Sequence, residues 1–142
     1  MKKLFFALIA VFALSYLPGY NVCAAENTSI IGNWEIKDLP SATARKIKPA
    51  PEANIAIQAA RVYGCAGDNR FFGSVKIEGS KLTFSHMGMT RMMGPNARYE
   101  GLFMESLNQV TQFAVIKGEM CLLNKDGKVM MILKPGKAKE QK

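Results

Sequence analysis

Histidine, cysteine and acidic residues are scarce in this chain, which has one histidine, three cysteines and 11 acidic residues among 142. No two cysteines form a CxxC pair, which excludes the common zinc-finger layouts. Carboxylates at a spacing suited to acid–base catalysis are not evident. Gly64-x-x-Gly67 lacks the Gly-Lys-Ser/Thr that completes a phosphate-binding loop. The sequence therefore indicates no catalytic constellation and no cofactor, and we expect a protein that is not an enzyme.

The rest of the composition is that of one ordinary globular domain. Hydrophobic residues make up 49% of the chain and charged residues 21%, with a mean hydropathy of +0.01. This balance argues against disorder, a collagen-like chain or a repeat array. The 19 basic residues give a net charge of +8, which would suit an anionic partner.

The first 25 residues have the pattern of a secretory signal peptide. Two lysines precede an apolar run over residues 4–17, and small residues follow at Cys23-Ala24-Ala25. The run of 14 residues is shorter than the roughly 20 that a membrane-spanning helix needs. We therefore predict cleavage after Ala24 or Ala25, a periplasmic or secreted location, and no transmembrane segment after processing.

A lipid anchor at Cys23 is the less favoured alternative. Lipoprotein signals place this cysteine after a Leu-x-small triplet, whereas the triplet here is Tyr20-Asn21-Val22. Simple secretion fits the sequence better.

Processing changes the reading of the cysteines and of the charge. Removing residues 1–25, which hold two lysines and no acidic residue, leaves about 117 residues, a charge of +6, and Cys65 and Cys121. An exported protein can form disulfides. A Cys65–Cys121 bond would close a loop of about 55 residues and contribute roughly 4 kcal/mol. We predict this disulfide, with two reduced thiols as the alternative.

Hydrophobic periodicity predicts strands, one helix, then more strands. The helix, of about four turns after Pro95 and Asn96, has an apolar stripe and leaves Glu100 and Glu105 exposed. Residues 39–51 are predicted as a loop, and the Met-rich segment 86–93 as irregular. The predicted strands cover residues 30–37, 53–63, 71–77, 81–85, 112–117, 120–124 and 128–133.

The predicted fold is α+β, with a curved, mainly antiparallel sheet packed on one amphipathic helix. We expect the sheet to be partly open and barrel-like. The predicted domain covers residues 26–134, and residues 135–142 are expected to form a flexible basic tail.

Several motifs in order resemble one protein family. A strand with Ile31-Gly32-Asn33-Trp34 comes first, and a glycine-rich turn then enters an aromatic strand at Phe71. Thr90-Arg91-Met92-Met93-Gly94-Pro95 precedes the helix. This series, over about residues 30–134, resembles the META domain (HslJ-like) family of bacterial envelope proteins. The positions that match the family motif are Trp34, Gly64, Gly67, Asn69, Phe72, Gly73, Thr90 and Met92.

The resemblance implies a small, non-enzymatic envelope protein linked to stress tolerance, and it names no ligand. The family commonly has two cysteines at positions that fall on Asp68 and Gly94 here. The usual cysteine pair is therefore absent from this chain, which leaves any role of that pair in doubt.

Three alternatives for function remain from the residues themselves. His86, Met87 and Met89 have side chains that suit Cu(I), although methionines also fill gaps in protein cores. The concave face of the sheet could carry a ligand or act as an inhibitor site. Pairing His86 with either remaining cysteine as a nucleophile has no support from spacing.

The positive charge supports an anionic lipid or an envelope protein as partner, or solubility alone. Its clusters lie in the early loop, at Arg45, Lys46 and Lys48, and in the C-terminal tail. Nucleic acid fits the sign of the charge, but export makes it a poor candidate. We expect a monomer.

Overall fold

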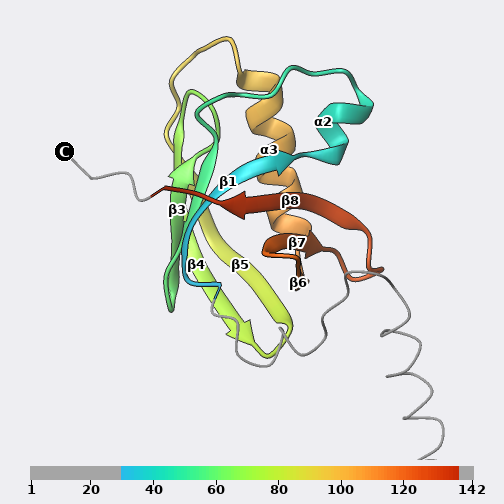
Figure 1. The fold of residues 1–142 in the computed structure, drawn as a ribbon. Helices are drawn as coiled ribbons and strands as arrows, with labels where there is room; N and C mark the ends of the chain where they lie inside the picture. The colour runs from blue at the N-terminus through green and yellow to red at the C-terminus, as the bar shows by residue number, and fades with distance from the viewer. Residues whose placement is uncertain (1–29, 138–142) are drawn as a thin grey trace, which may run out of the picture.

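The computed structural model describes residues 30–137, and its strands form a closed antiparallel barrel in which each strand pairs with its neighbours in sequence (Figure 1). Strand β8 pairs with β1 and completes the ring. The elements are β1 (Gly32–Asp38), α2 (Pro40–Ala44), β2 (Asn54–Ile57), β3 (Arg61–Cys65), β4 (Arg70–Glu78), β5 (Lys81–Met89), α3 (Ala97–Gln109), β6 (Gln112–Ile116), β7 (Glu119–Leu123) and β8 (Val129–Pro135).

The predicted antiparallel sheet packed on a helix is confirmed, but the sheet is closed rather than partly open. The seam between β5 and β6 is the shortest pairing in the ring, with Lys81 opposite Gln112 as its one register pair. Two backbone hydrogen bonds flank it, from Leu82 N to Thr111 O at 3.1 Å and from Phe113 N to Ser80 O at 2.9 Å. Closure removes the free strand edges that an open sheet would expose.

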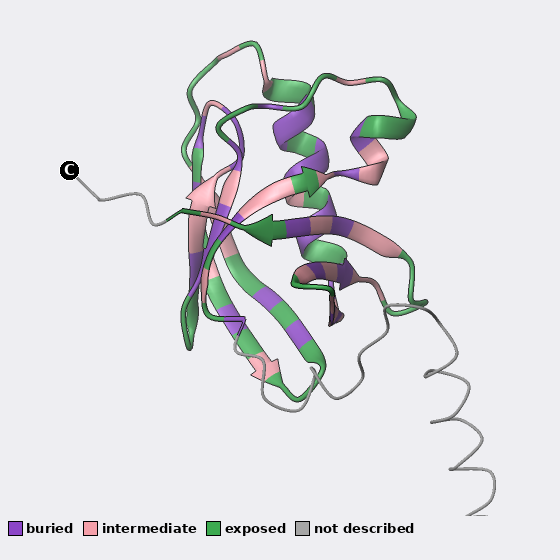
Figure 2. Ribbon diagram, in the orientation of Figure 1, coloured by how far each residue is buried: buried purple, intermediate pink, exposed green. Residues whose placement is uncertain are grey.

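Side chains fill the barrel interior. Along β4, Phe71 and Val75 are buried while Arg70 and Lys76 are exposed, as a period of two requires. Helix α3 packs against β5 and β8, and Phe103 brings its ring to 5.3 Å from that of Phe71. Figure 2 shows the buried face of α3 turned toward the strands. The concave face is thus occupied by the protein's own core.

Strand β5 is longer than predicted. The hairpin turn at Gly79 and Ser80 is confirmed, but β5 continues beyond Ser85 to Met89. His86 has a φ of +52° at a shift of register with β4 between Phe72 and Ser74. This bulge explains why the alternating pattern breaks at His86 although the strand does not end there.

Two further predictions were wrong in detail. The range 53–63, predicted as one strand, contains β2, a turn at residues 58–60 and the first part of β3. The predicted loop 39–51 contains α2, which begins at Pro40 and buries Ala42. A helix of five residues is too short to show a helical period, and its proline at the first turn also suits a loop.

Helix α3 buries the predicted stripe of Tyr99, Leu102, Phe103, Leu107 and Val110 as far as its C-cap. Glu105 is exposed as predicted. The prediction for Glu100 was wrong, because this side chain is only 2% exposed.

Strand β8 runs to Pro135, and Gly136 N then donates to Asn33 O at 2.8 Å. Residues 135–137, which the sequence assigned to the tail, therefore continue directly from a paired strand. The predicted signal peptide, with Cys23, and residues 138–142 lie outside the described residues. Within residues 30–137, no helix is long and apolar enough to cross a bilayer.

Candidate functional site

Four of the eight family-motif residues, Gly67, Asn69, Thr90 and Met92, lie together at one end of the barrel. We call this the motif end and define it as the turn 66–69 between β3 and β4, the connection 90–96 between β5 and α3, and the first turn of α3. It lies at the top of Figure 1. A Cβ atom on Gly67 would lie 3.4 Å from that of Ala50, so the loop after α2 belongs to the same end.

Asn69 and Glu100 form the centre of the motif end. Asn69 is 4% exposed. Its backbone N–H donates to Oε2 of Glu100 at 2.8 Å, and its Nδ2 donates to Oε1 at 3.1 Å. Both oxygens of a buried carboxylate are therefore bonded, which offsets the cost of removing its charge from water.

The same asparagine holds the connection 90–96. Asn69 Nδ2 donates to the carbonyl of Met92 at 2.9 Å, and Asn69 Oδ1 accepts from the Met92 N–H. The hydroxyl of Thr90 donates to Asn69 Oδ1 at 3.0 Å and accepts from Arg70 N–H at the same distance. The backbone of Met92 is thus fixed at both its donor and its acceptor.

Asp68 makes a second link across the motif end. Its Oδ2 accepts from the backbone N–H of Asn96 at 2.8 Å, and its Oδ1 accepts from Asn96 Nδ2 at 3.0 Å. Asn96 is the residue before α3, so Asp68 satisfies a free donor at the start of the helix. A Cβ atom on Gly94 would lie 2.3 Å from Asp68 Cγ, so only glycine fits beside this carboxylate.

The other motif residues have structural contacts. Trp34 is buried and donates from Nε1 to Ile30 O at 2.9 Å. A Cβ atom on Gly64 would lie 2.2 Å from Asn54 O of the paired strand, and one on Gly73 would lie 2.2 Å from Met87 Sδ. These glycines allow close packing of neighbouring strands.

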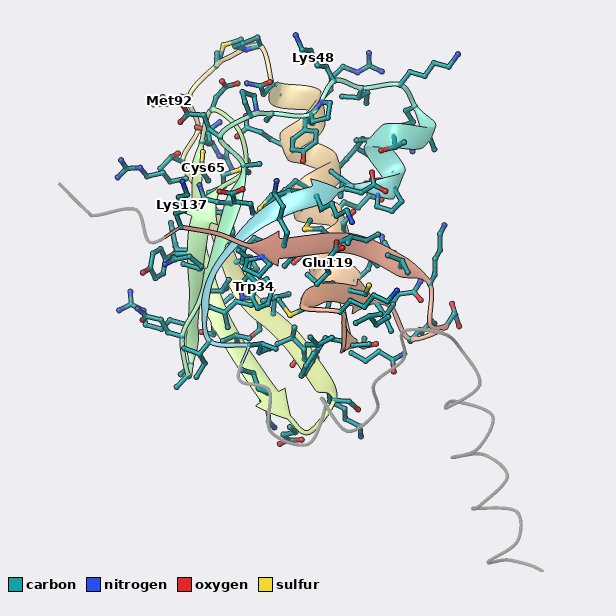
Figure 3. The ribbon with its side chains drawn as sticks, viewed as in Figure 1. Trp34, Lys48, Cys65, Met92, Glu119 and Lys137 are labelled. Atoms are coloured by element: carbon teal, nitrogen blue, oxygen red, sulfur yellow. The ribbon has the colours of Figure 1, made fainter. Side chains whose placement is uncertain are left out.

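The motif end exposes apolar side chains. Met92 is 64% exposed and Met93 is 102% exposed, and Phe72 is also exposed on the outer face of β4. Figure 3 shows Met92 at the same end of the molecule as Lys48. We call Met92 and Met93 the methionine tip.

Three arginines lie at the motif end, next to the methionine tip in sequence or on an adjoining element. Arg70, Arg91 and Arg98 are exposed, and none of them forms an ion pair with another residue in the range 30–137. Arg91 precedes the tip directly, and Arg98 lies in the first turn of α3.

The predicted Cys65–Cys121 disulfide is not formed, and both cysteines are free thiols. Strands β3 and β7 lie on opposite sides of the barrel, and each cysteine alternates with inward-facing residues. Both thiols therefore point outward in different directions. Cys65 donates to Gly67 O at 3.0 Å. Burial raises the pKa of the Cys121 thiol, and nearby Glu119 raises it further, while Lys37 opposes the shift.

The three residues of the copper alternative differ in their surroundings. Met87 and Met89 pack against the core, whereas His86, the bulge residue, is exposed. Among the described residues there is also no group of three or more His, Cys, Asp or Glu side chains that could hold a metal. Met87 and Met89 thus fill space beside the core, which is the other role considered for them.

One hollow lies on the outer surface at the seam between β5 and β6, at the end of the β4–β5 hairpin. Lys76 and Glu78 form an ion pair at 3.2 Å on its wall. The hollow is lined by Lys76, Glu78, Lys81, Thr83, Thr111, Gln112 and Lys125. We call it the lysine hollow.

Tyr99 lies beneath the motif end with its ring 6.3 Å from that of Phe103. Burial raises the pKa of Tyr99 to about 12, and the negative charge of Asp38 contributes to this shift. Tyr99 is therefore neutral under all ordinary conditions.

Glu100 is the residue of the site that the sequence prediction missed. It stands three residues before Phe103 and seven before Leu107, a spacing that places it on the buried face of α3. The sequence signal for its burial was Asn69 in the turn, a motif residue that can donate hydrogen bonds to a carboxylate. The prediction of the buried stripe counted only hydrophobic residues and therefore left Glu100 out.

Comparison with solved structures shows the same fold at low sequence identity. An NMR structure of a protein from Burkholderia xenovorans is 22% identical, with a TM-score of 0.55 over 82% of this chain and 89% of that one. A crystal structure of a duf4847 family protein from Bacteroides vulgatus is 16% identical, with a TM-score of 0.53 over 76% and 94%.

Comparison with curated proteins gives no match. The model of one family, the META domain, matches residues 28–137. That match covers the barrel and the helices α2 and α3, and it includes every residue of the motif end. The resemblance in the motifs is thus confirmed, and the chain belongs to the META domain family.

Proposed function

We propose that this protein is an exported, non-enzymatic binding protein of the bacterial envelope, and that the motif end is its contact surface. One observation carries the proposal. The motif residues Asn69 and Thr90 use their polar groups to hold the backbone that presents Met92 and Met93 to solvent. An exposed apolar tip on a rigid support is a feature of interaction surfaces.

The internal bonding of the site argues against catalysis. Both carboxylate oxygens of Glu100 and both polar atoms of the Asn69 side chain are engaged with protein groups. A general acid or base must be able to reach a substrate proton. Glu100 is buried beneath the connection 90–96 and cannot reach a substrate in solvent.

The apolar leader over residues 4–17 supports export, and the family resemblance supports a role in stress tolerance. The alternative of a ligand carrier has weaker support. Large buried side chains such as Phe71 and Phe103 occupy the barrel interior, and the lysine hollow is an outer-surface feature. A carrier of apolar ligands would need an enclosed apolar pocket.

The proposal is tested by site-specific crosslinking in envelope preparations. A photo-crosslinking residue replaces Met93 in the full chain, and a control chain has it in place of Lys125 in the lysine hollow. We expect adducts, to protein or lipid, from position 93 and few from position 125. Equal labelling at both positions, or none at position 93, would overturn the proposal.

Export is tested by cell fractionation of the full chain. The expected result is a shortened protein, cleaved after residue 24 or 25, in the periplasm or medium. Full-length protein in the cytoplasm would contradict this part of the proposal.

A further inference from the structure

We infer that the partner of the motif end is the surface of an anionic lipid bilayer, an inference that depends on the proposed function. Met92 and Met93 insert between lipids, and Arg70, Arg91 and Arg98 bind the phosphates of the headgroups. Three features of the motif end support a lipid partner: the apolar tip, the charge near it, and its small size.

The apolar part is two adjacent methionines that are unusually exposed. Met93 is 102% exposed and Met92 is 64% exposed, the highest values among the large hydrophobic side chains of the described residues. Methionine is flexible and adapts to an irregular apolar phase. Because Asn69 already holds the backbone of Met92, insertion needs little further ordering of the loop.

The charge at this end has one dominant sign. Arg70, Arg91 and Arg98 are exposed and without ion pairs to other residues of the described range, so their charges are available. Lys48 extends from the neighbouring loop at the same end (Figure 3). Anionic lipid surfaces attract such residues by about 1 kcal/mol each.

The exposed cations outnumber the acidic side chains that reach solvent near the tip. Glu100 is buried beneath the loop, and Asp68 is half-buried with both of its oxygens bonded to Asn96. Glu52 is the exposed acidic side chain of the adjoining loop. The surface that faces outward is therefore positive around an apolar centre.

The size of the tip favours a bilayer over a protein. A stable protein interface buries about 800 Å² on each partner and has an apolar core. Two methionines on one connection, with exposed arginines on the same connection and the adjoining elements, form a small apolar centre instead. Shallow insertion of a few apolar side chains, with basic residues at headgroup level, suits a membrane surface.

The lysine hollow provides a matched control for charge. Lys81 and Lys125 are exposed, form no ion pair within residues 30–137, and lie at the far end of the barrel. Replacing two cations there changes the net charge as much as replacing Arg91 and Arg98. A difference between the two pairs therefore reports position rather than total charge.

The test is co-sedimentation of the processed protein with vesicles of phosphatidylethanolamine containing about 30% phosphatidylglycerol. The comparison uses neutral phosphatidylcholine vesicles at the same salt concentration. We expect binding to the anionic vesicles alone. The R91Q/R98Q variant should bind roughly 30-fold more weakly, and M92S/M93S at least tenfold more weakly. K81Q/K125Q should stay within about twofold of the parent.

Insertion itself is read from Met93→Trp. Its fluorescence should shift to the blue on vesicles and be quenched by brominated acyl chains, whereas Trp34 is already buried and should not respond. Since all four variants, the control pair included, change exposed positions, their thermal midpoints should match the parent, which excludes misfolding.

Three results would overturn the inference: no binding to anionic vesicles, equal weakening by the two cation pairs, or no spectral response at position 93. Protein adducts at position 93 in envelopes without vesicle binding would leave the proposed function standing and refute the lipid partner. Failure of both experiments would refute both proposals.

Discussion

Replacing Asn69 by alanine should destabilise the protein strongly, because one side chain supports the whole motif end. The change removes the bonds from Nδ2 to Met92 O and to Glu100 Oε1, and the acceptor Oδ1. Glu100 keeps the bond from the Asn69 backbone N–H to Oε2, but its other oxygen loses its partner.

The magnitude follows from burial. An unsatisfied buried polar group costs about 1–3 kcal/mol, and more when it is charged. Thr90 and Met92 lie at the exposed edge, where water can replace their lost bonds. We therefore expect a loss of about 3 kcal/mol, most of it from Glu100.

The assay is urea unfolding of the processed protein. A loss of about 3 kcal/mol lowers the midpoint by roughly 2 M with an unchanged slope, and lowers the thermal midpoint by roughly 15 °C. Asn108, exposed on α3, is the matched control, and its change to alanine should alter stability by less than about 0.5 kcal/mol. A loss below about 1 kcal/mol for Asn69→Ala would refute the assignment of this network as the support of the loop.

Three further predictions concern pH, thiol reactivity and glycine. Burial raises the pKa of Tyr99 from its ordinary value of 10.0 to about 12. The stability that the neutral Tyr99 contributes is therefore fully present below pH 10 and is lost as the pH rises toward 12. Tyr99→Phe should therefore reduce the alkaline fall in stability measured by urea unfolding between these pH values. Mass spectrometry of the native protein should find Cys65 and Cys121 as free thiols. Cys121 should react slowly with maleimide at neutral pH and faster in alkali, because its pKa is raised, and rapid labelling at pH 7 would contradict this. Gly64→Ala should cost more than about 2 kcal/mol, because its Cβ would lie 2.2 Å from a backbone oxygen, whereas Gly101→Ala in α3, with nothing within 4 Å, should stabilise by about 0.5–1 kcal/mol. Equal effects in thermal unfolding would refute the packing argument.

The sequence predicted the parts of the fold that depend on local pattern. The β4–β5 hairpin alternates in hydrophobicity and turns at Gly79, and the stripe of α3 repeats at helical spacing. Closure of the barrel could not be predicted in this way. It needs β8 to pair with β1, at the two ends of the domain, and β5 to pair with β6. The second seam has one register pair, Lys81 and Gln112, which lie 31 positions apart in sequence and have no distinctive side-chain pattern.

The candidate site was predicted as a set of motif positions but not as a network. Asn69 and Thr90 were identified, whereas Glu100 was assigned to solvent because acidic residues are rarely buried unless they are paired. Its partner stands 31 positions earlier, so only the folded chain shows the pair. The disulfide prediction failed for the same reason, since export permits a bond but cannot supply the geometry.

Asp68 and Gly94 show how the site keeps its shape without the cysteine pair that family resemblance places at these two positions. A Cβ atom on Gly94 would lie 2.9 Å from Asp68 Cβ, while disulfides need about 3.8 Å, so a shift of about 1 Å would accommodate a bond. Closing this loop of about 26 residues would add about 3.5 kcal/mol, less the two bonds that Asp68 makes to Asn96. We therefore expect Asp68→Cys/Gly94→Cys to oxidise spontaneously and to unfold at higher urea than its reduced form. If the double variant stays reduced in air, the geometry of positions 68 and 94 in this protein does not permit a disulfide.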